Sequence, residues 1–227
     1  MSATSADLPP LLDELERQHG APGDLPPRTA LDWVLWENVA YLVSDERRAE
    51  VYAALADLCG LEPERILTTE PARLHELAAR GGMQPDRRVG KLLAIAETVL
   101  AEHDGDLDAA LTLPLAEARR ALQRFPGIGR PGADKILLFT GARAVPALES
   151  NGLRVLCRLG LVEEAKSYAT TYNRAVAVLE AHADRGCAWL RRTHDLLKAH
   201  GRTTCRIKAP ACADCAISPR CPAAHGA

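Results

Sequence analysis

Four cysteines near the end of the chain constrain its fold more than any other feature. Of the seven cysteines in 227 residues, these four lie within the last 23 in the spacing C-x6-C-x2-C-x5-C. They are Cys205, Cys212, Cys215 and Cys221. A tail this short cannot build its own core, but it becomes ordered when a metal centre joins its ends. Four thiolates suit either tetrahedral zinc or an iron–sulfur cluster, and the spacing alone leaves both open, beside unligated cysteines.

The rest of the chain has the apolar spacing of helices. Leu31, Val34, Leu35 and Val39 fall on one helical face, and similar faces recur up to about residue 112. Further helices are predicted at residues 11–18, 115–124, 133–140, 151–161, 175–183 and 187–200. Aromatic residues make up only 4% of the chain, which favours packed helices over sheets. No segment alternates as a strand does, so the sequence predicts an all-α fold.

Composition and charge limit which partners and which cellular compartment we expect. A formal net charge of −2 gives no global positive field, so any nucleic-acid binding has to rest on local patches. The sequence contains no recognisable signal peptide and no apolar run long enough to cross a membrane. We therefore expect a cytoplasmic protein that does not contact membranes. In that reducing compartment clustered cysteines hold metal more often than they form disulfides.

A glycine-rich turn, Phe-Pro-Gly-Ile-Gly-Arg-Pro-Gly, interrupts two helical stretches at residues 125–132. Gly127 and Gly129 let the backbone turn tightly around Ile128, which would anchor the turn in the core. The freed amides lie beside the start of the next helix and can face a phosphate. Pro131 suits the first turn of that helix, where its missing N–H costs little. A turn of this kind can also simply join two helices.

Both motifs resemble those of one known family. The segment from Leu197 to Cys221, with His200-Gly201-Arg202 before the cysteines, looks like the C-terminal segment of endonuclease III and its adenine-glycosylase relatives. In that family this spacing holds a [4Fe–4S] cluster. The turn resembles the helix–hairpin–helix of the same DNA glycosylase superfamily. Two short segments extend the resemblance to roughly residues 29–221: His103-Asp104-Gly105-Asp106 and Leu153-Arg154-Val155.

The resemblance implies a fold, a cofactor and an activity. The fold would have two lobes, a helical barrel with the hairpin at residues 28–142 and a helical lobe from residues 1–27 and 143–227. The second lobe would hold a [4Fe–4S] cluster on the four tail cysteines. The activity would be base-excision repair, with hydrolysis of the N-glycosidic bond of a damaged or mismatched base in double-stranded DNA. We expect a nucleoid-associated monomer, and the sequence does not specify the lesion.

Two positions depart from the family pattern. Alignment on Arg154 puts Glu149 where the family has its catalytic aspartate, so a carboxylate is kept on a side chain one methylene longer. Alignment on the hairpin puts Pro131 where bifunctional members carry the Schiff-base lysine, and Lys135 is one helical turn further on. We therefore expect a monofunctional glycosylase whose AP lyase activity is weak or absent. The alternative for Glu149 is a solvated residue that opens a helix.

The resemblance also implies where DNA is held. In the hairpin the implied contacts are Gly127, Gly129, Arg130 and Gly132. In the loop between the first two tail cysteines they are Arg206 and Lys208, within a segment at residues 185–208 that has seven basic residues and one acidic residue. A second surplus around the hairpin consists of Arg119, Arg120, Arg124, Arg130 and Lys135 against Glu117 and Asp134. Such runs are, in most proteins, solvated helix faces.

A side chain has to fill the gap left when a base is swung out of the duplex. The family uses a glutamine three residues before an aspartate, and anchoring this pattern on Asp45 puts Leu42 there. Leu42 could act as an apolar wedge, while Asn38 is the nearest amide. The aromatic residues nearby could line a base pocket or belong to the core. They are Trp33, Trp36 and Tyr41.

Two other classes of function stay open. The chain could be a lesion-binding DNA protein of the same fold that has lost catalysis, since both departures above affect catalytic positions. It could also be an interaction protein whose tail is held by zinc. Iron and visible colour in the purified protein would exclude the zinc protein, and base release from damaged DNA would exclude the inactive one.

Overall fold

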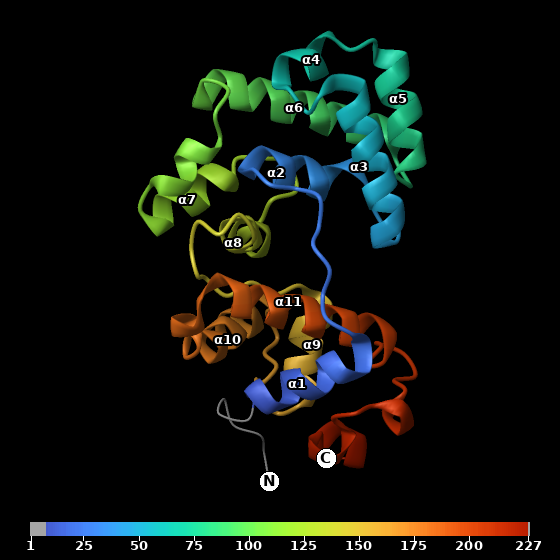
Figure 1. The fold of residues 1–227 in the computed structure, drawn as a ribbon, viewed down its shortest axis with the longest axis vertical. Helices are drawn as coiled ribbons and strands as arrows, with labels where there is room; N and C mark the ends of the chain where they lie inside the picture. The colour runs from blue at the N-terminus through green and yellow to red at the C-terminus, as the bar shows by residue number, and fades with distance from the viewer. Residues whose placement is uncertain (1–7, 227) are drawn as a thin grey trace. The chain divides into compact units, whose positions relative to one another are not determined.

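The computed structural model describes residues 8–226, which form α-helices joined by short 3₁₀ turns and loops (Figure 1). The predicted all-α fold is confirmed, because no β-strand occurs in this range beyond a single bridge between Tyr41 and Gly82. In the same range, no helix is both long and apolar enough to span a membrane.

The chain divides into two compact units. The continuous unit runs from Leu25 to Ala142. The discontinuous unit combines the described residues up to Asp24 with those from Arg143 onward. The tail cysteines and Glu149 belong to the discontinuous unit, and the glycine-rich hairpin belongs to the continuous one.

Seven α-helices form the described part of the continuous unit. They are α2 (Ala30–Val39), α3 (Asp45–Cys59), α4 (Pro63–Thr68), α5 (Pro71–Arg80), α6 (Pro85–His103), α7 (Leu115–Leu122) and α8 (Arg130–Phe139), with a 3₁₀ turn at Asp108–Thr112. Local sequence sets where they start. Thr29 and Asp32 form a reciprocal capping box on α2, and Ser44 caps α3. Prolines occupy the first turns of α4, α5, α6 and α8.

Aromatic residues of α2 form the centre of the core of the continuous unit. Trp33 and Trp36 are 1% and 2% exposed. Trp33 packs edge-on against Phe139 with ring centres 5.0 Å apart, and Trp36 packs against Tyr52 at 5.4 Å. Of the two interpretations of these tryptophans, the structure supports the core. Tyr41 differs, because its side chain is 61% exposed.

Four α-helices and several 3₁₀ turns form the described part of the discontinuous unit. The helices are α1 (Leu8–His19), α9 (Ser150–Arg158), α10 (Tyr168–Glu180) and α11 (Gly186–Thr203). The turns are Ala183–Arg185, Cys212–Asp214, Ser218–Arg220 and Pro222–His225. In Figure 1, α1 lies alongside α11, and the leucines of α1 are buried in the core that these helices share.

Two details differ from the sequence analysis. Helix α10 begins at Tyr168, seven residues before the predicted start, because Ser167 caps it and its first turns are partly buried through Thr171 and Tyr172. Of the three cysteines outside the tail, Cys59 is buried as expected, but Cys157 and Cys187 are only half-buried.

Candidate functional site

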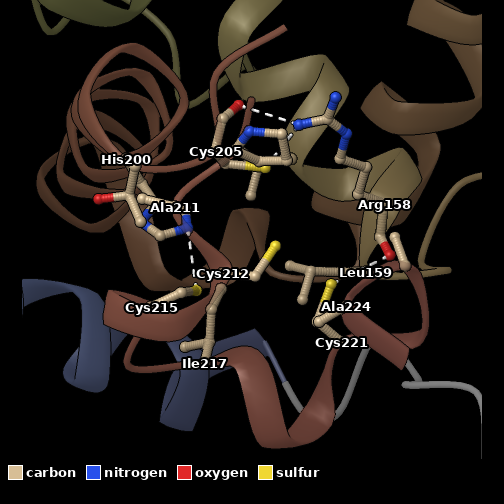
Figure 2. Close-up of a pocket in the computed structure, with 14 residues that line it drawn as sticks. Arg158, Leu159, His200, Cys205, Ala211, Cys212, Cys215, Ile217, Cys221 and Ala224 are labelled. Carbon is tan, nitrogen blue, oxygen red and sulfur yellow. Dashed lines mark hydrogen bonds between the residues drawn. The ribbon is translucent and has the colours of Figure 1, made fainter. Parts of the chain in front are cut away.

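The four tail cysteines line one cavity of about 220 Å³ in the discontinuous unit. Figure 2 shows their sulfur atoms facing this shared space, with Leu159 and Ile217 among the apolar residues around it. The volume is several times the roughly 30 Å³ that one water molecule occupies in the liquid. Three 3₁₀ turns between Cys212 and His225 bring the last three cysteines onto the cavity wall. The structure therefore brings together the four residues that the sequence predicted as ligands.

The donor set around the cavity bears on what it can hold. Within the described residues, no group of three or more His, Cys, Asp or Glu side chains is placed to bind a single metal ion. The four thiols nevertheless line one space, and four thiolates are the donor set of an iron–sulfur cluster as well as of zinc. By their chemistry, the residues present fit the cluster.

Two side chains place nitrogen atoms close to the sulfur atoms (Figure 2). The Arg158 guanidinium lies 3.3 Å from Cys205 Sγ and donates to the carbonyl oxygens of Cys205, Arg206 and Ile207. His200 Nε2 lies 3.6 Å from Cys215 Sγ, and its Nδ1 lies 2.9 Å from His19 Nε2. Burial, followed by the charge of His19, lowers the pKa of His200 to about 4, so the ring is neutral at pH 7. The hydrogen bonds from Arg158 to the three carbonyl oxygens hold the loop that begins at Cys205.

The thiols need a compensating positive charge to ionise. Burial raises the pKa of Cys215 and Cys221, and the charges of the other tail cysteines raise it further. Metal centres bind thiolates rather than thiols, and they supply the positive charge that holds them deprotonated. Burial therefore favours the neutral thiols, and a bound metal centre would supply the charge needed to hold them as thiolates.

The candidate carboxylate of Glu149 caps α9. Its Oε1 accepts a hydrogen bond from the Gly152 amide at 2.8 Å, and its Oε2 accepts one from Asn151 Nδ2 at 2.6 Å. The side chain is half-buried. The helix-opening role that was the alternative for Glu149 is thus observed. It does not exclude chemistry, because a carboxylate has about four lone-pair sites and these two donors occupy two.

A chain of hydrogen bonds joins the Glu149 carboxylate to the loop that carries the first cysteine. Asn151 Oδ1 accepts from Arg154 Nη2 at 2.8 Å, and the same nitrogen donates to the Gly201 carbonyl at 2.7 Å. Arg154 Nε donates to the Cys205 carbonyl at 3.0 Å. Gly201 permits this close approach of α11 to α9, since a Cβ there would lie 2.7 Å from the Asn151 carbonyl oxygen. The sequence analysis used Arg154 only as an alignment anchor and missed this link.

The hairpin of the continuous unit has the expected local structure. Phe125 and Ile128 are buried, and Ile128 donates its amide to the Phe125 carbonyl at 3.2 Å. Gly127 has φ +76°, a conformation that side chains with a Cβ rarely adopt. Gly129 is the N-cap of α8, and Pro131 lies in its first turn. The hairpin thus presents the N-terminus of a ten-residue helix, whose first amides have no intrahelical acceptor.

The predicted basic surplus around the hairpin needs correction, because most of these cations have acidic partners. Arg119 and Arg130 lie 2.6 and 3.5 Å from the fully buried Asp134. Arg124 pairs with Glu102 at 2.5 Å, and Lys135 pairs with Glu37 at 2.6 Å. Glu102 and Glu37 come from segments that were not counted with the hairpin. Arg120 remains exposed on α7.

The remaining predicted DNA contacts lie in the loop that follows Cys205 and in α2 and the loop after it. Arg206 and Lys208 are exposed, and Arg206 also donates to the Ala209 carbonyl at 3.1 Å. Leu42 is 75% exposed with φ +55°, whereas Asn38 is 4% exposed and donates to the Val34 carbonyl. Of the two gap-filling candidates, Leu42 thus lies at the surface and Asn38 does not.

Comparison with known proteins adds to this geometry. No protein-family model matches the chain. Endonuclease III of Escherichia coli strain K12 is 26% identical over 158 residues, which cover 66% of this chain and 68% of that relative. A solved structure of a trapped endonuclease III–DNA covalent intermediate superimposes over 98% of both chains with a TM-score of 0.77 at 17% identity. The chain is endonuclease III-like. A thermostable thymine-DNA glycosylase also shares the fold, with a TM-score of 0.71 at 16% identity over 98% of this chain and 96% of that one.

The endonuclease III-like fold accounts for the order of the motifs along the chain. The hairpin precedes the Glu149 carboxylate, which precedes the four cysteines, as the sequence resemblance implied. The two departures lie at Pro131, a residue without an amine, and at Glu149, a longer carboxylate.

Proposed function

We propose that this chain is a DNA glycosylase of base-excision repair, which hydrolyses the N-glycosidic bond of a damaged or mismatched base in double-stranded DNA. The observation that carries the proposal is the Glu149 carboxylate, held by two N–H donors at the start of α9 in an endonuclease III-like fold. The solved relatives in complex with DNA support DNA as the substrate class.

In this mechanism Glu149 acts on the sugar of an extruded nucleotide. Its two bound donors fix the orientation of the carboxylate, while the unused lone pairs can accept from a water molecule. The carboxylate would activate that water and stabilise the positive charge that develops on the deoxyribose as the base departs. Asn151 holds one carboxylate oxygen, and Arg154 holds Asn151 in turn.

The reaction would stop at base removal. Covalent strand cleavage needs an amine that attacks the sugar, and Pro131 supplies none. The nearby Lys135 amine is 14% exposed, is paired with Glu37 and lies 5.0 Å from the centre of the Trp33 ring. We therefore propose a monofunctional enzyme. Borohydride reduction with abasic DNA should trap little adduct, while Pro131→Lys should raise the yield. Efficient trapping by the unaltered protein would contradict this part of the proposal.

The four tail cysteines would hold a [4Fe–4S] cluster. When bound, the cluster supplies iron–thiolate bonds that brace the tail, and Arg158 orients the Cys205 loop beside it. Arg206 and Lys208 on that loop would contact DNA phosphates, as would Gly127, Gly129, Arg130 and Gly132 of the hairpin. Leu42 would fill the gap left by the extruded base. Iron and sulfide analysis of the purified protein tests the cluster, and stoichiometric zinc without iron would refute it.

A lesion panel tests the glycosylase function. Duplexes that each carry one damaged or mismatched base are incubated with the protein and treated with alkali, which cuts the strand where a base is lost. We expect base loss from at least one duplex, and Glu149→Gln should lower that rate by about 100-fold or more. Glutamine keeps an acceptor for the Gly152 amide, so the helix start is preserved while the charge is removed.

The second candidate function is lesion binding without catalysis, which is favoured by the fully formed capping role of Glu149 and by Pro131. If no duplex loses a base while the protein still binds lesions more tightly than undamaged DNA, this second function replaces the first. If Glu149→Gln releases bases as fast as the unaltered protein, another group is the catalyst.

A further inference from the structure

A cavity of about 230 Å³ in the continuous unit lies next to the hairpin. Its walls come from the end of α2, the loop after it, and the start of α6; they include Glu37, Asn38, Tyr41, Met83, Arg87 and Lys91. The two loops are clamped together. The Tyr41 amide donates to the Gly81 carbonyl at 2.9 Å, and the buried Arg88 donates to the carbonyls of Ala78 and Met83 at 2.8 and 2.6 Å. The cavity is therefore a fixed feature of this unit.

Lys91 brings an ammonium group from this cavity to the hairpin. A Cβ placed on Gly127 would lie 3.3 Å from Lys91 Nζ, so the ammonium rests against the turn. The side chain is half-buried, and within the described residues it has no acidic partner. Burial lowers the pKa of Lys91, and the charges of Arg87 and Arg88 lower it further. A cation in such a position is stabilised by an anionic ligand.

The one carboxylate on the cavity wall is already engaged elsewhere. Glu37 Oε1 lies 2.6 Å from Lys135 Nζ, and its Oε2 lies 3.7 Å from Arg48 Nη1. The cations nearest the hairpin in sequence are also engaged, Arg119 and Arg130 by Asp134. Lys91 differs from them, because it approaches the turn without such a partner.

Asn38 supplies a buried acceptor beside the turn that can hold the Lys91 ammonium there. Its Oδ1 is buried and has no hydrogen-bond partner among the described residues. Its orientation is fixed, because Nδ2 donates to the Val34 carbonyl at 2.9 Å. The unpartnered oxygen faces the turn, 3.0 Å from where a Gly127 Cβ would be. A buried acceptor without a donor is costly, and an ammonium drawn toward the turn would satisfy it.

We propose that Lys91 is a phosphate-binding cation of the hairpin, in addition to the Arg130 contact proposed above. Its ammonium binds an oxygen of a DNA backbone phosphate that also accepts from the amides at the start of α8, while Asn38 Oδ1 holds the ammonium from the other side. The ligand is a phosphodiester of double-stranded DNA. The inference rests on the proposed function only in taking DNA as the partner, and it does not depend on base release.

The test is the salt dependence of binding to an undamaged duplex, measured for the full chain. Each phosphate contact contributes about 0.9 to the slope of log K against log salt concentration. We expect Lys91→Gln to lower the slope by roughly that amount. Lys91→Arg should retain it, because the charge is kept. Lys166→Gln is the matched control, since Lys166 is an exposed lysine of the other unit, and it should leave the slope unchanged.

Asn38→Asp gives a second test that does not remove Lys91. The new carboxylate would neutralise the ammonium internally, so the slope should fall by a similar amount. Combining it with Lys91→Gln should produce no further loss. An unchanged slope in Lys91→Gln, an equal fall in Lys166→Gln, or additive losses in the double variant would overturn the assignment. If the unaltered chain binds the duplex in a salt-dependent way but one of these three results is found, only the assignment of Lys91 fails. If the unaltered chain binds no duplex at all, the proposed function fails as well.

Discussion

The hairpin at residues 125–132 and the tail at residues 205–226 are both short and irregular, yet different interactions hold them in place. The hairpin has its own apolar anchors, Phe125 and Ile128, and leads directly into α8. In the described tail, Ile217 is the only buried residue, and the polypeptide surrounds a cavity lined by sulfur atoms. The hairpin is therefore held by its own apolar residues, whereas the tail contributes little apolar core of its own.

The largest effect should come from breaking the proposed metal centre. Cys212→Ser removes one thiolate, and we expect loss of iron together with destabilisation of more than about 4 kcal/mol, the range associated with loss of a metal site. For a chain of this size that corresponds to a fall in melting temperature of roughly 10 °C. Circular dichroism melting and iron analysis measure both quantities.

Cys187→Ser is the control for this prediction, because Cys187 is a half-buried cysteine outside the tail. It should retain iron and melt within a few degrees of the unaltered protein. A Cys212→Ser protein that kept both its iron and its melting temperature would mean that the tail is ordered without its thiolates.

A smaller effect is expected when the hairpin loses its anchor. Ile128 is 5% exposed, and truncation of a buried isoleucine to alanine costs about 2–5 kcal/mol. Chemical denaturation should show this loss for Ile128→Ala, while iron content stays that of the unaltered protein. A loss of iron from this variant would show that the two regions depend on each other. It would contradict the conclusion that different interactions hold the hairpin and the tail.

Gly127→Ala should change the hairpin without removing its anchor. The positive φ and the 3.0 Å approach to Asn38 Oδ1 both oppose a Cβ, so we expect destabilisation of about 1–3 kcal/mol. Duplex binding should weaken as well, because the turn can no longer present its amides. Gly23→Ala is a suitable control, since a Cβ there would meet nothing within 4 Å. Equal behaviour of the two variants would argue against a strained turn at Gly127.

The smallest effect should come from the surface contact between the tail and α1. Arg220 forms an ion pair with Glu14, both partly exposed. Because exposed pairs contribute about 0–1 kcal/mol, Glu14→Gln should shift the melting temperature by no more than a few degrees and leave iron bound. A shift as large as that of Cys212→Ser would mean that the ion pair, rather than the metal centre, holds the tail.

Local patterns in the sequence predicted much of this structure. The helical faces, the buried Ile128 and the first-turn position of Pro131 each depend on residues a few positions apart, so spacing was sufficient to find them. The four cysteines were identified in the same way, and the structure gathers them around one cavity.

Contacts between residues far apart in the sequence could not be predicted from local spacing. Lys135 and Glu37 are 98 residues apart, and Arg192 and Glu16 are 176 apart, so counting charges along the chain overstated the basic surfaces. The approach of Lys91 to Gly127 and the link from Arg154 to Cys205 likewise depend on how helices pack. Periodicity shows which face of a helix is apolar, but not which neighbour that face will meet.

The discontinuous unit has a consequence for synthesis of the protein. Of the described helices, α1 is synthesised first, with four leucines that are buried in the finished protein. Its partners α9 and α11 begin at Ser150 and Gly186, so the continuous unit is completed before they emerge. At elongation rates of about 5–20 residues per second, the nascent chain carries these leucines uncovered for on the order of ten seconds. We expect that interval to be when the polypeptide most needs protection from aggregation.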